Sequence, residues 1–100
     1  MNGEPRGAIV TGASSGIGAA VAVELARRGV DVLVNYVQNR TAAEAIAASC
    51  RTHGVRAEVA QGDVAADADC RAVAAAALAA FGRIDYLVNN AGVSKFVAHA

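Results

Sequence analysis

The sequence is poor in cysteine and in charge of either sign. Its two cysteines, Cys50 and Cys70, form no C-x-x-C pair and no Cys/His ligand spacing, so neither a disulfide framework nor a metal site is expected. Both fall on apolar helix faces, where core packing is the favoured role. Nine basic residues balance nine acidic ones without forming a basic cluster, which disfavours nucleic acid and anionic membranes as partners.

Long hydrophobic runs are also missing. The longest stretch without a polar or charged residue, Ala72–Gly82, is far shorter than the roughly 20 residues that span a bilayer. The opening residues, Met1–Arg6, are not followed by the apolar segment of a signal peptide. We therefore expect a soluble, cytoplasmic protein.

The residues that are abundant are small and apolar. Hydrophobic residues make up 55% of the chain, and 26 of the 100 residues are alanine, which argues against disorder. A length of 100 residues allows one domain at most. We therefore expect residues 1–100 to form a single domain.

Strand and helix patterns alternate along the chain. Apolar runs without alternation predict strands buried on both faces, and apolar positions at helical spacing predict helices between them. Thr41 with Glu44, and Asp67, are the expected N-terminal caps of the second and third helices. The expected elements are a strand at Ala8–Val10, a helix from Gly16 to Gly29, a strand at Val30–Val34, a helix from Thr41 to Gly54, a strand at Val55–Gln61, a helix from Asp67 to Gly82 and a strand at Ile84–Val88. This order predicts an α/β fold of the Rossmann type, a doubly wound parallel sheet with strand order 3-2-1-4.

A glycine-rich loop separates the first strand from the first helix. Gly12, Gly16 and Gly18 follow the spacing G-x-x-x-G-x-G, and no Lys-Ser/Thr pair follows as it would in a P-loop. Glycines at such a turn allow the backbone N–H groups at a helix N-terminus to approach a pyrophosphate. The alternative is a merely flexible loop. Phosphate binding is favoured over this alternative because a strand precedes the loop and a helix follows it.

The carboxyl ends of parallel strands meet at one edge of a sheet. Gly12, Tyr36, Asp63 and Asn90 follow the four expected strands, so we expect them to line one crevice. Asp63 can accept a hydrogen bond from an adenine amino group, and it can equally be a turn aspartate. The segment Asn89–Gly92 can be a plain turn.

The motif from Thr11 to Gly18, together with Asn89–Gly92 and Asp63-Val64, resembles the short-chain dehydrogenase/reductase family. Within it, the chain is most similar to 3-oxoacyl-carrier-protein reductases and glucose dehydrogenases. The resemblance implies an oxidoreductase that transfers hydride between NAD(P) and a carbonyl or alcohol substrate, and a homo-oligomeric parent protein. It implies three groups of cofactor contacts: Gly12, Ser14, Ser15, Gly16, Ile17 and Gly18 around the ribose and pyrophosphate; Asp63 and Val64 at adenine; and Asn90, Ala91 and Gly92 beside a ribose.

No catalytic residue of that family is identifiable here. The resemblance implies a Tyr-x-x-x-Lys motif, but neither Tyr36 nor Tyr86 has a lysine four residues later. The residue four positions before the single lysine, Lys95, is an alanine. We expect this chain to be the cofactor-binding part of a longer enzyme, without activity by itself. The alternative is a nucleotide-binding or structural α/β module that performs no redox chemistry.

The end of the second strand favours NADP over NAD. An acidic side chain normally accepts the ribose 2′-hydroxyl there, but this chain has Asn35 and Tyr36, and Asp31 lies at the start of the strand. We therefore include Asn35, Tyr36 and Arg40 among the cofactor contacts, with Arg40 as the group that reaches a 2′-phosphate. The alternative for Arg40 is a solvated charge at the start of a helix.

Overall fold

The protein was analysed as a computed structural model, which describes residues 5–14 and 16–90. Strands and helices alternate along the chain, as the sequence predicts. The elements are β1 (Gly7–Val10), α1 (Gly16–Arg27), β2 (Asp31–Tyr36), α2 (Arg40–Arg51), β3 (Ala57–Gln61), α3 (Asp67–Phe81) and β4 (Tyr86–Val88). No helix in the described part of the chain is both long enough and apolar enough to cross a membrane.

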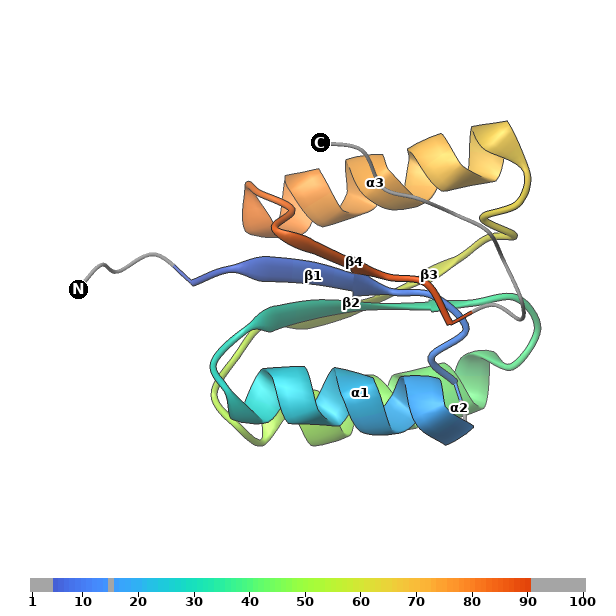
Figure 1. The fold of residues 1–100 in the computed structure, drawn as a ribbon. Helices are drawn as coiled ribbons and strands as arrows, with labels where there is room; N and C mark the ends of the chain where they lie inside the picture. Colours follow the sequence, from blue (N-terminus) through green and yellow to red (C-terminus); the bar gives the residue numbers. More distant parts are fainter. Residues whose placement is uncertain (1–4, 15, 91–100) are drawn as a thin grey trace.

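The strands form one parallel sheet in the order β3-β2-β1-β4, which confirms the predicted Rossmann-type topology. In the centre of the sheet, Ile9 pairs with Leu33 on one side and with Leu87 on the other. Helices α1 and α2 cover one face and α3 covers the other (Figure 1). This arrangement follows from right-handed crossovers, because the chain moves outward from β1 through β2 to β3 and then returns to the opposite side of β1.

Two apolar clusters lie on the two faces of the sheet. Val10, Val32 and Val34 point toward α1 and α2, whose buried positions are mainly alanines. Ile9 and Leu33 point the other way and pack against α3. Successive strand residues are therefore buried on opposite faces, which explains why β1 and the middle of β2 read as uninterrupted apolar runs.

The helix caps differ from the predicted ones. The N-cap of α2 is Asn39, whose Oδ1 accepts the N–H of Ala42 at 3.0 Å. Thr41 therefore lies inside the helix, and Glu44 pairs with Arg40 at 3.4 Å. Cap preferences identify the type of residue but not which of several adjacent candidates has the required backbone conformation.

The third helix departs from the prediction in two further places. Ala66 is the N-cap of α3 and makes no side-chain cap bond, so Asp67 is the first helical residue and pairs with Arg71 at 3.0 Å. The helical spacing of its apolar residues also predicts that Leu78 faces inward, but Leu78 is 50% exposed, because the buried stripe follows Val73, Ala77 and Phe81. An alanine-rich helix has little contrast between its faces, so the apolar pattern did not fix its rotation.

A buried carboxylate, Asp31, joins strands at the amino edge of the sheet. Its Oδ1 accepts the main-chain N–H of Arg56 at 2.9 Å, and its Oδ2 accepts the guanidinium at 3.0 Å from Nε and 2.9 Å from Nη2. Arg56 also donates to the carbonyl of Ala80 at 3.0 Å and lies 5.6 Å from the ring centroid of Phe81. One ion pair therefore links the start of β2 to the start of β3 and to the end of α3.

We predict that Asp31→Ala lowers the free energy of unfolding by about 1–3 kcal/mol, because it removes the acceptor of a partly buried N–H and of a guanidinium. Urea denaturation measures the change. Asp67→Ala is the matched control, because the side chains of Asp67 and Arg71 are 79% and 81% exposed, and we expect no measurable change. Equal losses in the two variants would contradict this account of Asp31.

Candidate functional site

Thr11 joins the ends of β1 and β4 at the carboxyl edge of the sheet. Its N–H donates to the carbonyl of Val88 at 3.0 Å, and its hydroxyl oxygen accepts the N–H of Asn90 at 2.9 Å. The same hydroxyl lies 3.2 Å from Oδ1 of Asn89 and can donate to it. Thr11 is buried, so these bonds are shielded from water. From the sequence, Thr11 was singled out only as the first residue of the motif; the signal for its bonding role was a hydroxyl directly after a buried strand.

Gly18, in the first turn of α1, packs directly against both strand ends. A Cβ atom there would lie 2.6 Å from the carbonyl oxygen of Gly12, 2.6 Å from Nδ2 of Asn90 and 3.0 Å from Cα of Ala13. That amide group of Asn90 donates to the Gly12 carbonyl at 3.3 Å. The structure thus brings Gly12, Gly18 and Asn90 together at one point, where a side chain on Gly18 has no room.

The glycine loop is exposed at Gly16 and Ile17, where α1 begins. Gly12 and Gly16 have φ values of 58° and 61°, in the left-handed region that favours glycine. An added Cβ on Gly16 would meet no atom within 4 Å, and Ile17 is 74% exposed. The start of α1 is therefore exposed at Gly16 and Ile17, where the helix N–H groups without an intrahelical partner and the positive end of the helix dipole favour an anion.

Two residues at the end of β2 that were predicted to contact the cofactor are buried in the fold. Asn35 is 1% exposed and Tyr36 is 4% exposed, because both belong to β2 rather than to the loop after it. The side chain of Tyr36 is part of the core under α1 and α2. The predicted strand ended at Val34 because a polar residue followed, and sequence alone did not show that the Asn35 amide finds partners inside the fold.

Asp63 and Arg40 are exposed at the same edge, and Val64 is partly exposed there. Oδ1 of Asp63 accepts the N–H of Ala65 at 3.0 Å, so this residue does shape a turn, while its exposed position leaves the carboxylate accessible. Arg40 is exposed and forms its ion pair with Glu44. Ser14 is half-buried in the glycine loop, whereas Ser15, Ala91 and Gly92 lie outside the described residues.

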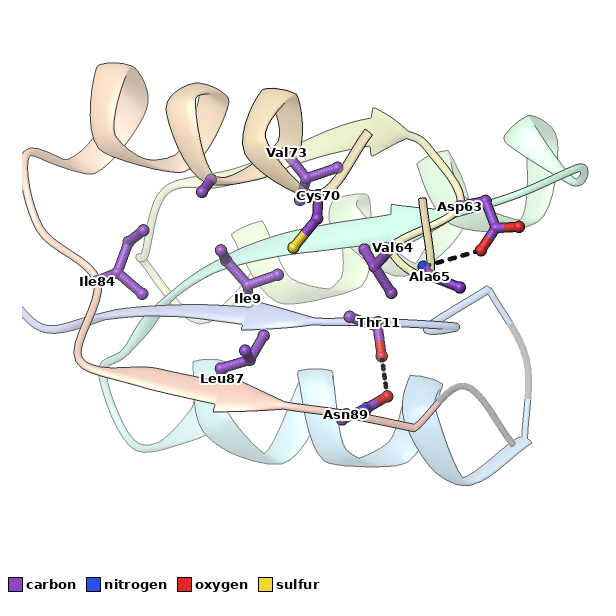
Figure 2. Close-up of a pocket in the computed structure, with 11 residues that line it drawn as sticks. Ile9, Thr11, Asp63, Val64, Ala65, Cys70, Val73, Ile84, Leu87 and Asn89 are labelled. Atoms are coloured by element: carbon purple, nitrogen blue, oxygen red, sulfur yellow. Dashed lines mark hydrogen bonds between the residues drawn. The ribbon is translucent and has the colours of Figure 1, made fainter. Parts of the chain in front are cut away.

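A cavity of about 460 Å³ lies between α3 and the sheet, next to this edge (Figure 2). Thr11, Asp63, Val64 and Asn89 border it near the strand ends. Its remaining lining is mostly apolar and comes from β1, the turn before α3, α3, the segment that leads into β4, and β4 itself: Ile9, Ala65, Cys70, Val73, Ala74, Ile84 and Leu87. The polar groups at one end and the apolar wall are the features of a pocket that can receive part of an organic ligand.

The shifted titratable groups lie elsewhere. The Arg27 and Arg28 guanidiniums lower the pKa of Glu24 to about 2, and Arg83 lowers that of Asp85. Burial raises the pKa of the Cys50 thiol, whose Sγ lies 3.6 Å from the carbonyl of Ala22. Within residues 5–14 and 16–90, no three His, Cys, Asp or Glu side chains are grouped to hold a metal ion. The exposed start of α1 and the apolar pocket beside the strand ends suit binding of an anionic organic molecule.

Comparison with known proteins agrees with this geometry. Residues 6–100 match the short chain dehydrogenase family. The chain is 44% identical over 95 residues to an uncharacterized oxidoreductase of Methylorubrum extorquens and 46% identical over 88 residues to a 3-oxoacyl-[acyl-carrier-protein] reductase of Synechocystis. These matches cover 95% and 88% of this chain but only 38% and 36% of the relatives, so the chain spans little more than a third of their length.

Solved structures give the same result. An acetoin dehydrogenase from Enterobacter cloacae superposes with a TM-score of 0.83 and 36% identity, over 94% of this chain and 37% of its own. A hydroxysteroid dehydrogenase from Escherichia coli gives 0.82 and 34%, over 89% of this chain and 37% of its own. The similarity therefore extends to the arrangement of all the strands and helices described above.

We predict that Gly18→Ala displaces Asn90 and lowers the free energy of unfolding by about 1–3 kcal/mol through overpacking. The side-chain amide resonance of Asn90 in a ¹⁵N NMR spectrum should shift. Gly16→Ala is the matched control: it costs about 1–2 kcal/mol for the left-handed backbone, but it should leave that resonance unchanged because its Cβ meets no atom. An unshifted Asn90 resonance in folded Gly18→Ala would contradict the contact.

Proposed function

The chain belongs to the short-chain dehydrogenase family, and from that premise we propose that it binds NADP(H) as the cofactor-binding part of an oxidoreductase. The nicotinamide cofactor, when bound, supplies or accepts the hydride. The substrate of the whole protein is a small carbonyl or alcohol, and the whole protein is a homo-oligomer. This chain contributes the surface that holds the adenosine and pyrophosphate.

The observation that carries the proposal is the contact of Gly18 with Gly12 and Asn90. A pyrophosphate must come within hydrogen-bond distance of the N–H groups at the start of α1, and a Cβ on Gly18 would push that turn away from the strand ends. The hydroxyl of Thr11 holds Asn90 in place through its main-chain N–H. Both motifs of the sequence are thus parts of one surface, which supports a single ligand that contacts both.

The residues that follow β2 and β3 support a nucleotide whose adenine end lies near the turn after β3. The Asp63 carboxylate is exposed there and can accept from an adenine amino group, and Val64 lines the adjoining cavity. The buried Asn35 and Tyr36 leave no carboxylate side chain at the end of β2 to accept a ribose 2′-hydroxyl. Arg40, in the first turn of α2, is the cation available for a 2′-phosphate, in competition with Glu44.

We predict that NADPH binds more tightly than NADH. Arg40→Ala should reduce the ratio of the NADH to the NADPH dissociation constant about tenfold, equivalent to about 1.4 kcal/mol. Isothermal titration calorimetry with both cofactors measures it. Arg28→Ala is the matched control, because Arg28, directly after α1, also pairs with a glutamate four positions away in the sequence, at 2.8 Å, and lies at the other end of the sheet.

Equal or tighter binding of NADH by the unmodified protein would contradict the choice of NADP. Equal losses in the Arg28 and Arg40 variants would show that Arg40 acts only through net charge.

Within residues 5–14 and 16–90, neither tyrosine is placed to donate a proton to a carbonyl at this edge. Tyr36 is buried in the core, and the hydroxyl of Tyr86 accepts from Nη1 of Arg6 at 2.8 Å at the start of β4. Neither tyrosine is followed four residues later by a lysine that could lower its pKa.

We therefore predict that residues 1–100 alone bind cofactor but do not turn over any carbonyl or alcohol. Cofactor absorbance, followed with a panel of ketones, is compared with that of a version extended by about 150 residues. Turnover by residues 1–100 at the rate of the extended protein would place the proton donor within this chain. Cofactor binding without turnover in the extended protein would favour a nucleotide-binding module that performs no redox chemistry.

A further inference from the structure

Asn35 connects the two loops that border the proposed adenosine site. Its main-chain carbonyl accepts the N–H of Ala13 in the glycine loop at 3.0 Å. Its side-chain Nδ2 donates to the carbonyl of Ala60 at 3.2 Å and to that of Gly62 at 3.0 Å. The loop after β1 and the turn after β3 are therefore both attached to one residue near the end of β2.

The amide nitrogen of Asn35 has two hydrogens, and the two carbonyls use both. The opposite orientation of the amide would place Oδ1 against two carbonyl oxygens, so the nitrogen must face them. A carboxylate of the same size has no hydrogen to donate and would be repelled there. The side chain is 1% exposed, so water cannot replace the lost bonds without a local opening.

The turn held by Asn35 carries Asp63. The N–H of Gly62 donates to the carbonyl of Tyr36 at 2.9 Å, and that of Asp63 donates to Oδ2 of Asp69 at 2.9 Å. Gly62 is also enclosed by α3, since a Cβ there would lie 3.2 Å from Cγ2 of Val73. Of the side chains bonded to this turn, Asn35 is the buried one and comes from the strand that also orients the glycine loop.

We propose that Asn35 is a positioning residue for the adenosine half of the cofactor, acting through the Ala60 and Gly62 carbonyls rather than by contact with the nucleotide. This inference rests on the proposed function. It implies that a structural amide, Asn35, stands near the end of β2, the region where a carboxylate normally accepts the ribose 2′-hydroxyl. An acidic residue introduced there would weaken nucleotide binding instead of creating an NAD-specific site.

The test uses ADP-ribose, which contains adenine and the pyrophosphate but no nicotinamide, with the protein and its Asn35→Asp variant. At neutral pH we expect affinity about fivefold to tenfold weaker for Asn35→Asp, because a carboxylate faces two carbonyl oxygens. Burial and these oxygens raise the pKa of the new carboxyl, and its protonated form can donate one hydrogen bond. The affinity of the variant should therefore recover as pH falls from about 8 toward about 5, relative to the unmodified protein. Asp63 and Asp69, the carboxylates on the adjoining turn and helix, are present in both proteins and cancel in this comparison.

Gln61→Glu is the matched control, because it is the same amide-to-acid change at an exposed position that also joins the ends of β2 and β3. Nε2 of Gln61 donates to the carbonyl of Val37 at 3.0 Å. We expect less than about a twofold change in ADP-ribose affinity, since water can replace this exposed bond, and a pH profile like that of the unmodified protein. A purely global loss of stability in Asn35→Asp would lower the binding stoichiometry and leave the dissociation constant of the folded molecules unchanged, which would overturn the positioning role.

Asn35→Ala keeps the proposal testable if the aspartate variant does not fold. It should bind ADP-ribose more weakly with no recovery at low pH, and the amide of Gly62 should exchange its hydrogen faster in the free protein. Unchanged affinity and unchanged exchange in folded Asn35→Ala would overturn the role of Asn35. Failure of the unmodified protein to bind ADP-ribose would instead overturn the proposed function, and the exchange of Gly62 would still report whether Asn35 holds the turn.

Discussion

The hydrogen bond from the N–H of Asn90 to the hydroxyl of Thr11 is the interaction on which the arrangement of the candidate site depends. It joins residues 79 positions apart, across the neighbouring strands β1 and β4. With the chain fixed there, the side chain of Asn90 reaches the carbonyl of Gly12, and Gly18 can pack beside both. A parallel sheet supplies no hairpin to hold its strand ends together, so side-chain bonds at the edge take over that task.

The polar connections at the two edges of the sheet differ in charge. At the amino edge, charged pairs join the strands: Asp31 with Arg56, and Asp85 with Arg83 and the N–H of Gly7. At the carboxyl edge, the buried connections of Thr11 and Asn35 are uncharged. Uncharged connections leave the positive end of the α1 dipole without a buried carboxylate that would oppose an anion.

The sequence was sufficient to predict the strand order and the position of the glycine loop, because apolar runs and glycines report burial and backbone conformation directly. It was not sufficient for Asn35 and Tyr36, which continue β2 into the core. The polarity of Asn35 indicated a loop, and only the fold supplies the carbonyls of Ala60 and Gly62 that make its burial possible. The ion pair of Asp31 was missed for the same reason, since its partner Arg56 is 25 positions away.

The buried alanines of α1 and α2 restrict which substitutions this part of the protein tolerates. Ala22, Ala26, Ala43 and Ala47 are fully buried, and they lose no side-chain entropy on folding. Truncation of a core residue normally leaves a cavity, but at these positions only glycine is smaller, so almost every replacement enlarges the side chain. Substitution at these four alanine positions is therefore limited by crowding, whereas substitution at Leu33, Val73 and Phe81, on the α3 face, is limited by loss of volume.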